Sequence, residues 1–121
     1  MSEPAALALV DEHDPSRLAG LRSLGGQALA RDLVSLFLEH SREKLTAAHA
    51  ALDARDLPTV AFAAHALKSS CGQLGVLSMQ AACIAAERAA SAGDGIGARA
   101  AVVDATAALD RARGWLESEM A

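Results

Sequence analysis

The last quarter of the sequence carries the most regular pattern of apolar residues in the chain. Between Ala98 and Leu116, apolar residues recur at positions i, i+3, i+4, i+7, i+11, i+14 and i+18. This spacing places all of them on one side of an α-helix. No stretch alternates apolar and polar residues as a β-strand does. The chain is therefore restricted to helices that must each bury an apolar face. The stripe consists of Ala98, Ala101, Val102, Ala105, Leu109, Ala112 and Leu116.

Composition and helix-ending residues indicate how these helices are arranged. Apolar residues make up 52% of the chain and aromatic residues only 2%, and alanine, the best helix former, dominates. Asp14-Pro15 begins a short helix that Gly25-Gly26 ends, and short loops join the remaining helices. We predict an all-α fold, an up-down antiparallel four-helix bundle with an additional short N-terminal helix. The predicted helices cover about 14–24, 27–54, 56–74, 77–92 and 98–116, with a flexible segment expected at 1–13 and the bundle domain at 14–121.

Size and charge exclude several classes of function. A chain of 121 residues suffices for one core but not for a kinase fold with its nucleotide pocket. The formal charge of −4, without a Lys/Arg cluster, argues against a nucleic-acid partner. The acidic start of the chain fits neither a signal peptide nor a membrane insertion, so we expect a cytoplasmic protein. Cys71 and Cys83 lack the spacing of a metal or redox motif, and we expect two buried free thiols.

The central predicted helix presents an apolar stripe on one side and a histidine on the other. At 3.6 residues per turn, His65 lies about 160° around the helix from Leu67, the centre of the stripe, and so points to solvent. Residues three, four and seven positions apart share a helix face, which brings Lys68 and several small residues beside the imidazole. The apolar stripe consists of Val60, Ala63, Ala64, Leu67, Cys71 and Leu74. The residues around His65 are Ala61, Phe62, Lys68, Ser69 and Gly72, and Gln73 lies nearer the edge of the same helix face.

The run from His65 to Gly75, HALKSSCGQLG, resembles the signature of histidine-containing phosphotransfer (HPt) domains of bacterial multistep phosphorelays. That signature is roughly H-x-L-K-G-[small]-[small]-x-x-L-G. His65 matches its phosphorylated histidine and Lys68 its lysine, whereas Ser69 stands where glycine is usual. The resemblance extends from about Asp14 to the end of the chain.

The resemblance implies a phosphorelay intermediate. His65 would accept a phosphoryl group from a receiver-domain aspartate and pass it to another receiver domain, and Lys68 would offset its negative charge. The implied partners are response-regulator receiver domains and a hybrid sensor histidine kinase. We expect no autonomous kinase activity and a monomeric chain. We also expect no cofactor or metal bound to this chain, with Mg²⁺ bound to the receiver domain only. The expected partner-binding surface consists of Ala61, Phe62, Ser69, Gly72 and Gln73.

Two other functions are less consistent with these residues. The alternative function is a helical adaptor that binds a kinase or receiver partner without carrying phosphate, although such an adaptor needs neither His65 nor Lys68. A metal site built from His65 and Cys71 fails because the two side chains point to opposite faces. Phe62 is either a docking contact or packed against a neighbouring helix. We expect Trp115 to be a packing residue, His40 and His49 to lie at the boundary of the core, and Glu87 and Arg88 to lie on the outer side of their helix; His13 carries no signal.

Overall fold

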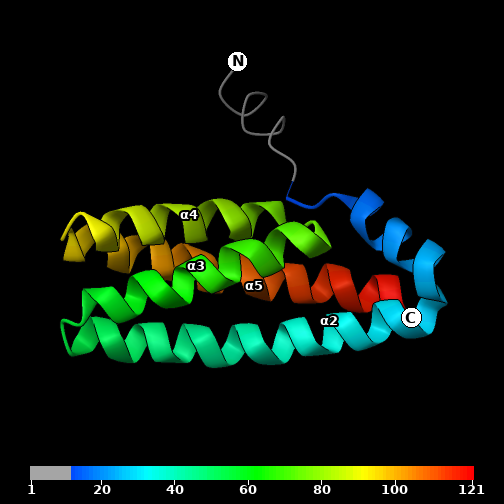
Figure 1. Ribbon diagram of the computed structural model, residues 1–121, viewed down its shortest axis with the longest axis horizontal. Helices are drawn as coiled ribbons and strands as arrows, with labels where there is room; N and C mark the ends of the chain where they lie inside the picture. The colour runs from blue at the N-terminus through cyan, green and yellow to red at the C-terminus, as the bar shows by residue number, and fades with distance from the viewer. Residues whose placement is uncertain (1–11) are drawn as a thin grey trace, which may run out of the picture.

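The computed structural model describes residues 12–121, which form four helices and no named strand. Helices α2 to α5 run side by side along the long axis of the molecule (Figure 1). Each helix packs mainly against its neighbours in the chain, and α5 also returns to α2 and closes the bundle. The predicted all-α, up-down four-helix bundle is therefore confirmed. The helices are α2 (Pro15–Asp53), α3 (Leu57–Leu74), α4 (Leu77–Ser91) and α5 (Gly95–Met120).

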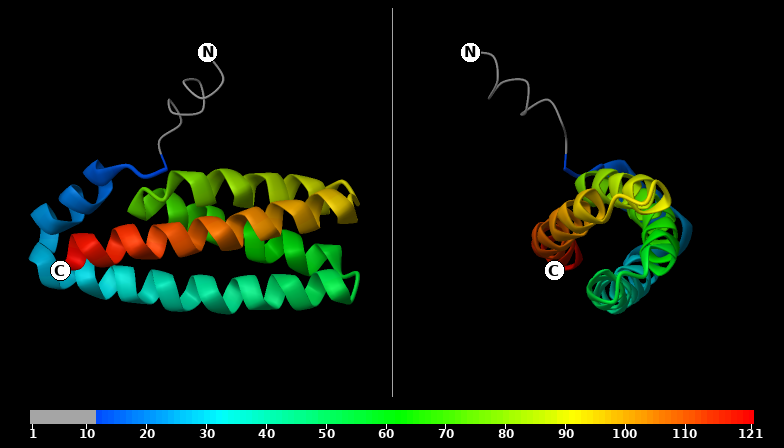
Figure 2. Two further views of the ribbon diagram at one scale, coloured as in Figure 1. Left: turned by 180° about the vertical axis from the view of Figure 1, so that it is seen from behind. Right: turned by 90° about the vertical axis from the view of Figure 1, so that its left-hand side faces the viewer.

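Helix α2 contains the predicted break at Gly25-Gly26. Gly25 (φ −140°) and Gly26 (φ +74°) have non-helical backbone angles, so α2 is two helical segments joined by a kink. The first segment, Pro15–Leu24, leans away from the axis of the long segment and reaches toward the α3–α4 turn (Figures 1 and 2). We call it the N-terminal arm. Leu18 anchors the arm in the core, and Arg22 ties it to α5 by donating to the Glu119 carbonyl oxygen at 2.8 Å.

The turn between α3 and α4 is closed by residues that precede the arm. Gly75 has φ +74°, a conformation that favours glycine, and its carbonyl accepts a hydrogen bond from the Asp14 amide at 2.8 Å. A Cβ at position 75 would collide with the Asp14 carbonyl oxygen. His13 forms a single antiparallel bridge with Val76. The described chain thus contacts the bundle from residue 12 onward; the segment 1–11, within the part predicted to be flexible, lies outside the described residues.

The core is built from the predicted stripes. All six stripe residues of α3 and all seven of α5 are buried. Small alanine side chains at many of these positions allow the helices to pack closely. Cys71 and Cys83 are buried free thiols, as predicted. Within the described residues, no helix is both long and apolar enough to cross a membrane.

Candidate functional site

His65 lies on the solvent side of α3, where the helical phase places it. Its side chain is 63% exposed, whereas Leu67, two residues later, is 2% exposed. The helix that carries it is capped by Asp56, whose carboxylate accepts a hydrogen bond from the Thr59 amide at 3.2 Å. This N-cap and the buried stripe fix the rotation of α3 about its axis. The imidazole is consequently presented to solvent from a rigid helix.

Glu87 of α4 connects His65 with Lys68, and the sequence did not indicate this role. One carboxylate oxygen of Glu87 lies 2.8 Å from Nδ1 of His65, and the other accepts from Nζ of Lys68 at 2.7 Å. The expected position on the outer side of α4 holds for Arg88, which is exposed, but Glu87 reaches across to α3 with its side chain only 25% exposed. His65, Lys68 and Glu87 therefore form one hydrogen-bonded cluster, here called the site triad.

The register of the α3–α4 hairpin offers a signal by which Glu87 could have been found. The turn between the two helices is short, so residues equally far from Val76 along the chain face each other. His65 and Glu87 are each eleven residues from Val76, and Gly72 and Gln80 are each four residues from it. Both pairs are in contact across the hairpin. Counting outward from the turn would thus have paired Glu87 with His65.

The electrostatics of the triad define which nitrogen of His65 is available. The hydrogen bond from Lys68, and then that from His65, holds the pKa of Glu87 below its usual range, so this carboxyl is an anion at neutral pH. An anionic carboxylate only accepts hydrogen bonds, so Nδ1 must carry the proton in this contact. In neutral imidazole the other nitrogen, Nε2, then keeps its lone pair. This tautomer is assigned from the hydrogen-bond network, and it directs the nucleophilic nitrogen away from α4.

Gly72 is half-buried, unlike the open position expected for it. A Cβ at position 72 would lie 2.7 Å from Nε2 of Gln80, whose side chain also donates to the Lys68 carbonyl oxygen at 3.4 Å. The absence of a side chain at Gly72 therefore lets the Gln80 amide pack over α3. This packing gives Gly72 a structural role whether or not a partner also contacts it.

The other residues of the expected docking surface are spread over two sides of α3. Phe62 is 74% exposed, so the alternative in which it packs against a neighbouring helix is wrong. Ser69 is exposed beside His65, while Ala61 is half-buried against the core. Gln73 is exposed but lines a cavity between α3 and α2. The continuous exposed stripe around the histidine consists of Phe62, His65 and Ser69.

The remaining histidines lie apart from the triad. Half-buried His49 contacts Thr106 of α5, with Nε2 and Oγ1 3.0 Å apart, as expected of a boundary residue. His40 is exposed rather than at the core boundary. His13 stacks on Trp115 with ring centroids 4.3 Å apart, which confirms the packing role of the tryptophan. Within residues 12–121, no group of three or more His, Cys, Asp or Glu side chains is placed to hold a metal ion.

Comparisons with known proteins bear on the family and the fold of this chain. A family model described as the Hpt domain matches residues 32–115. Among solved structures, the chain is similar to histidine-containing phosphotransfer protein B (HptB) from Pseudomonas aeruginosa PAO1, with a TM-score of 0.85 and 24% identity over 92% of this chain and 96% of that one. At this identity the likeness bears on the fold alone. No curated protein matches the sequence significantly.

Proposed function

Because this chain belongs to the Hpt domain family, whose members are phosphorelay intermediates, we propose that His65 is the residue that carries its phosphoryl group. The observation that supports this assignment is the site triad. An exposed imidazole has its proton held at Nδ1 by Glu87 and a cation, Lys68, one helical turn away. Of the four histidines in the sequence, His65 is the one in this arrangement.

In the proposed reaction, Nε2 of His65 attacks the phosphorus of an aspartyl phosphate on a receiver domain. The N–P bond forms as the P–O bond to the aspartate breaks, and the aspartate leaves as a carboxylate with the electron pair. The proton stays on Nδ1, so the phosphorylated ring is cationic and faces the Glu87 anion. The reverse transfer uses the same contacts, because the imidazole is then the leaving group.

Lys68 supports the same step through charge. A phosphoryl group adds close to two negative charges near neutral pH. The Lys68 ammonium, on the same face of α3 as His65, offsets part of this charge, and Glu87 keeps the ammonium in place before the transfer. Phosphoryl transfer depends mainly on positioning and electrostatic stabilisation, which this small cluster can provide.

The donor and acceptor in this proposal are receiver domains, with a hybrid sensor histidine kinase upstream. Hpt domains exchange phosphate with receiver domains, and the chain would act as a monomeric phosphocarrier that takes phosphate from a receiver rather than from ATP. Mg²⁺ would be supplied by the receiver. The exposed stripe of Phe62, His65 and Ser69 would lie at the centre of the docking surface, with Ala61, Gly72 and Gln73 at its margins.

The test is phosphoryl transfer from a panel of ³²P-labelled receiver domains to the wild-type chain and to His65→Ala. We expect the wild type to accept an acid-labile, base-stable label from at least one receiver and His65→Ala to accept none. The variant should fold normally, because substitutions at such exposed sites change stability by about 0.5 kcal/mol or less. His49→Gln is the matched control; its amide can still bond to Thr106, and it should accept label as the wild type does. Label on His65→Ala would assign the phosphate to another histidine.

A further inference from the structure

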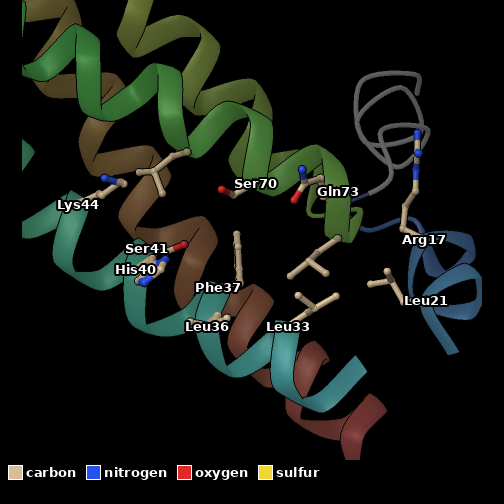
Figure 3. Close-up of a pocket in the computed structure, with 12 residues that line it drawn as sticks. Arg17, Leu21, Leu33, Leu36, Phe37, His40, Ser41, Lys44, Ser70 and Gln73 are labelled. Atoms are coloured by element: carbon tan, nitrogen blue, oxygen red, sulfur yellow. The ribbon is translucent and has the colours of Figure 1, made fainter. Parts of the chain in front are cut away.

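A cavity separates α2 from α3 on the side of the bundle away from the site triad. It has a volume of about 420 Å³ and is lined by both segments of α2 and by the second half of α3. The kink at Gly25-Gly26 creates it, since the N-terminal arm leans back over one end instead of continuing the helix (Figures 1 and 3). Arg17 and Leu21 of the arm line that end.

The lining of this cavity is divided into a polar end at Lys44 and an apolar middle, and Arg17 and Gln73 lie at the far end (Figure 3). Figure 3 shows Lys44, His40 and Ser41 together at one end, and Leu33 and Leu21 toward the other. Phe37 and Leu36 lie between them, and Leu67 and Leu74 supply the wall from α3. A ligand that follows this division would have an apolar body and a polar head.

The charge of the lining is opposite to that of the whole chain. The chain carries −4 with histidine counted as neutral, yet the charged residues of the lining are Arg17 and Lys44, with no aspartate or glutamate. Arg17 is paired with Asp14 at 3.7 Å. Lys44 and His40 have no ion pair or side-chain hydrogen bond with any residue between 12 and 121. Their end of the cavity therefore favours an anionic head.

Ser41 provides a second, independent sign of a polar ligand. Its hydroxyl is fully buried and has no hydrogen-bond partner within the described chain. Buried hydroxyl groups are ordinarily hydrogen-bonded, so an unpartnered one in a cavity wall is unusual. It lies on the cavity side of α2, next to His40 and Lys44 (Figure 3). Because this hydroxyl is fully buried, a ligand head would reach it only after the surrounding side chains shift.

From these features, we propose that the cavity binds a small amphipathic carboxylate of the aliphatic-acid class. The carboxylate lies between Lys44, His40 and the Ser41 hydroxyl, and the alkyl chain extends along Phe37 toward Leu33 and Leu21. The volume of the cavity falls in the range of roughly 300–1,000 Å³ that is typical of small-molecule sites. The inference does not depend on the phosphoacceptor role of His65, because none of the triad residues lines the cavity.

The experiment is an NMR titration of the ¹⁵N-labelled chain with decanoate below its micelle concentration. We expect saturable shifts confined to amides of the cavity lining, with decan-1-ol binding roughly fivefold or more weakly and decyltrimethylammonium not binding. These three probes share the alkyl chain and differ in the charge of the head. Shifts spread over the surface, no saturable shift, or equal binding of all three would overturn the proposal.

Two pairs of variants locate the site. Lys44→Ala should weaken decanoate binding roughly fivefold, whereas Arg42→Ala, which removes the same charge from an exposed position two residues away, should change it less than about twofold. Ser41→Ala should weaken binding without loss of stability, and Ser70→Phe should abolish binding by filling the cavity.

Should Ser70→Phe fail to fold, the Lys44→Ala and Arg42→Ala pair still decides: equal decanoate affinities for these two variants contradict the proposal. Phosphoryl transfer is not measured here, so failure of one proposal leaves the other intact.

Discussion

Glu87 contacts both His65 and Lys68 of the proposed site, which makes it the most informative residue of the site to replace. In Glu87→Gln the amide oxygen can still accept from Nδ1 of His65, but the negative charge facing the ring is lost. We expect transfer at saturating receiver to slow roughly threefold to tenfold, with receiver affinity unchanged, and a larger effect in Glu87→Ala. Single-turnover transfer kinetics measure this. Glu43→Gln, on an exposed part of α2, is the control. Wild-type rates in both Glu87 variants would mean that Glu87 only joins the two helices.

Substitutions of Lys68 distinguish a role in stabilising the phosphoryl group from a role in binding the receiver. Lys68→Ala should keep the fold and the receiver affinity, but slow transfer roughly fivefold, because a partly exposed ammonium that is also paired with Glu87 offsets only part of the phosphoryl charge. Lys68→Arg should recover part of the rate, and both differences should shrink as salt screens the charges. Transfer rates across a salt series, with receiver affinity measured in parallel, test this. A loss of affinity with the saturated rate unchanged would make Lys68 a docking residue.

Single residues could be predicted where local spacing determines them. His65 and Lys68 share one helix, so their neighbourhood follows from the helical period alone. Glu87 was missed because its contact with His65 depends on the register between two helices. Gly72 was interpreted from α3 alone, so the Gln80 side chain of α4 that covers it was not foreseen. The parts of the site that lie within α3 therefore follow from the helical period alone, whereas the contacts across the hairpin follow only when the residues of α3 and α4 are paired outward from Val76.

At the level of helices, Leu67 reports on the rotation of α3. It is 2% exposed at the centre of the buried stripe, opposite His65. Leu67→Ala should lower the free energy of unfolding by about 2–5 kcal/mol, as truncations of buried leucines do. The same substitution at Leu24, which is 82% exposed, should change it by about 0.5 kcal/mol or less. Equal denaturation midpoints for Leu67→Ala and wild type would contradict the rotation that exposes His65.

Helix boundaries were well predicted because the caps and breakers act locally. Asp14, Asp56 and Asp94 each accept a hydrogen bond from the first turn of the helix that follows, and Gly75 ends α3 in the left-handed conformation. The predicted separation at Gly25-Gly26 is a kink rather than a loop. Its angle depends on what the arm packs against, including the contact of Arg22 with α5, and sequence spacing contains no information on that contact.

On the scale of the whole molecule, residues 12–14 join the α3–α4 turn to α5, and this junction is expected to weaken in acid. Burial lowers the pKa of His13, and the hydrogen bond from Arg111 lowers that of Glu12. For a group whose pKa is lowered by folding, the stabilisation is complete above its unfolded value and is lost as the pH falls toward the folded one. As the pH falls, the junction should thus loosen first where His13 becomes protonated, in the imidazole range. It should loosen again where Glu12 becomes protonated, below the ordinary range of glutamate.

Amide hydrogen exchange at Asp14 measures this, because its amide is protected by the bond to the Gly75 carbonyl oxygen. Relative to the core amides of α5, the protection of Asp14 should fall as the pH is lowered through the imidazole range. His13→Phe keeps a ring against Trp115 but cannot titrate, so it should remove the first of the two steps. An unchanged first step in this variant would assign it to another group.

The cavity between α2 and α3 is the feature of the whole molecule that the sequence least indicated. Its lining combines the arm, the long segment of α2 and α3, so it exists only once the kink angle and the helix packing are set. In the sequence, Leu33, Leu36 and Phe37 only broaden the apolar surface of their helix, and this breadth does not predict a cavity. The unpartnered hydroxyl of Ser41 has no counterpart in any local pattern.

The stacked pair of His13 and Trp115 provides a built-in optical reporter. The chain contains one tryptophan and no tyrosine, so near-ultraviolet emission comes essentially from a single indole. That indole lies against an imidazole ring of the junction, and a protonated imidazole quenches indole emission by accepting an electron. Titration of the imidazole should therefore change the emission intensity of Trp115, and undocking of the junction should change its emission wavelength. No label needs to be attached to follow how this end of the bundle responds when a receiver docks.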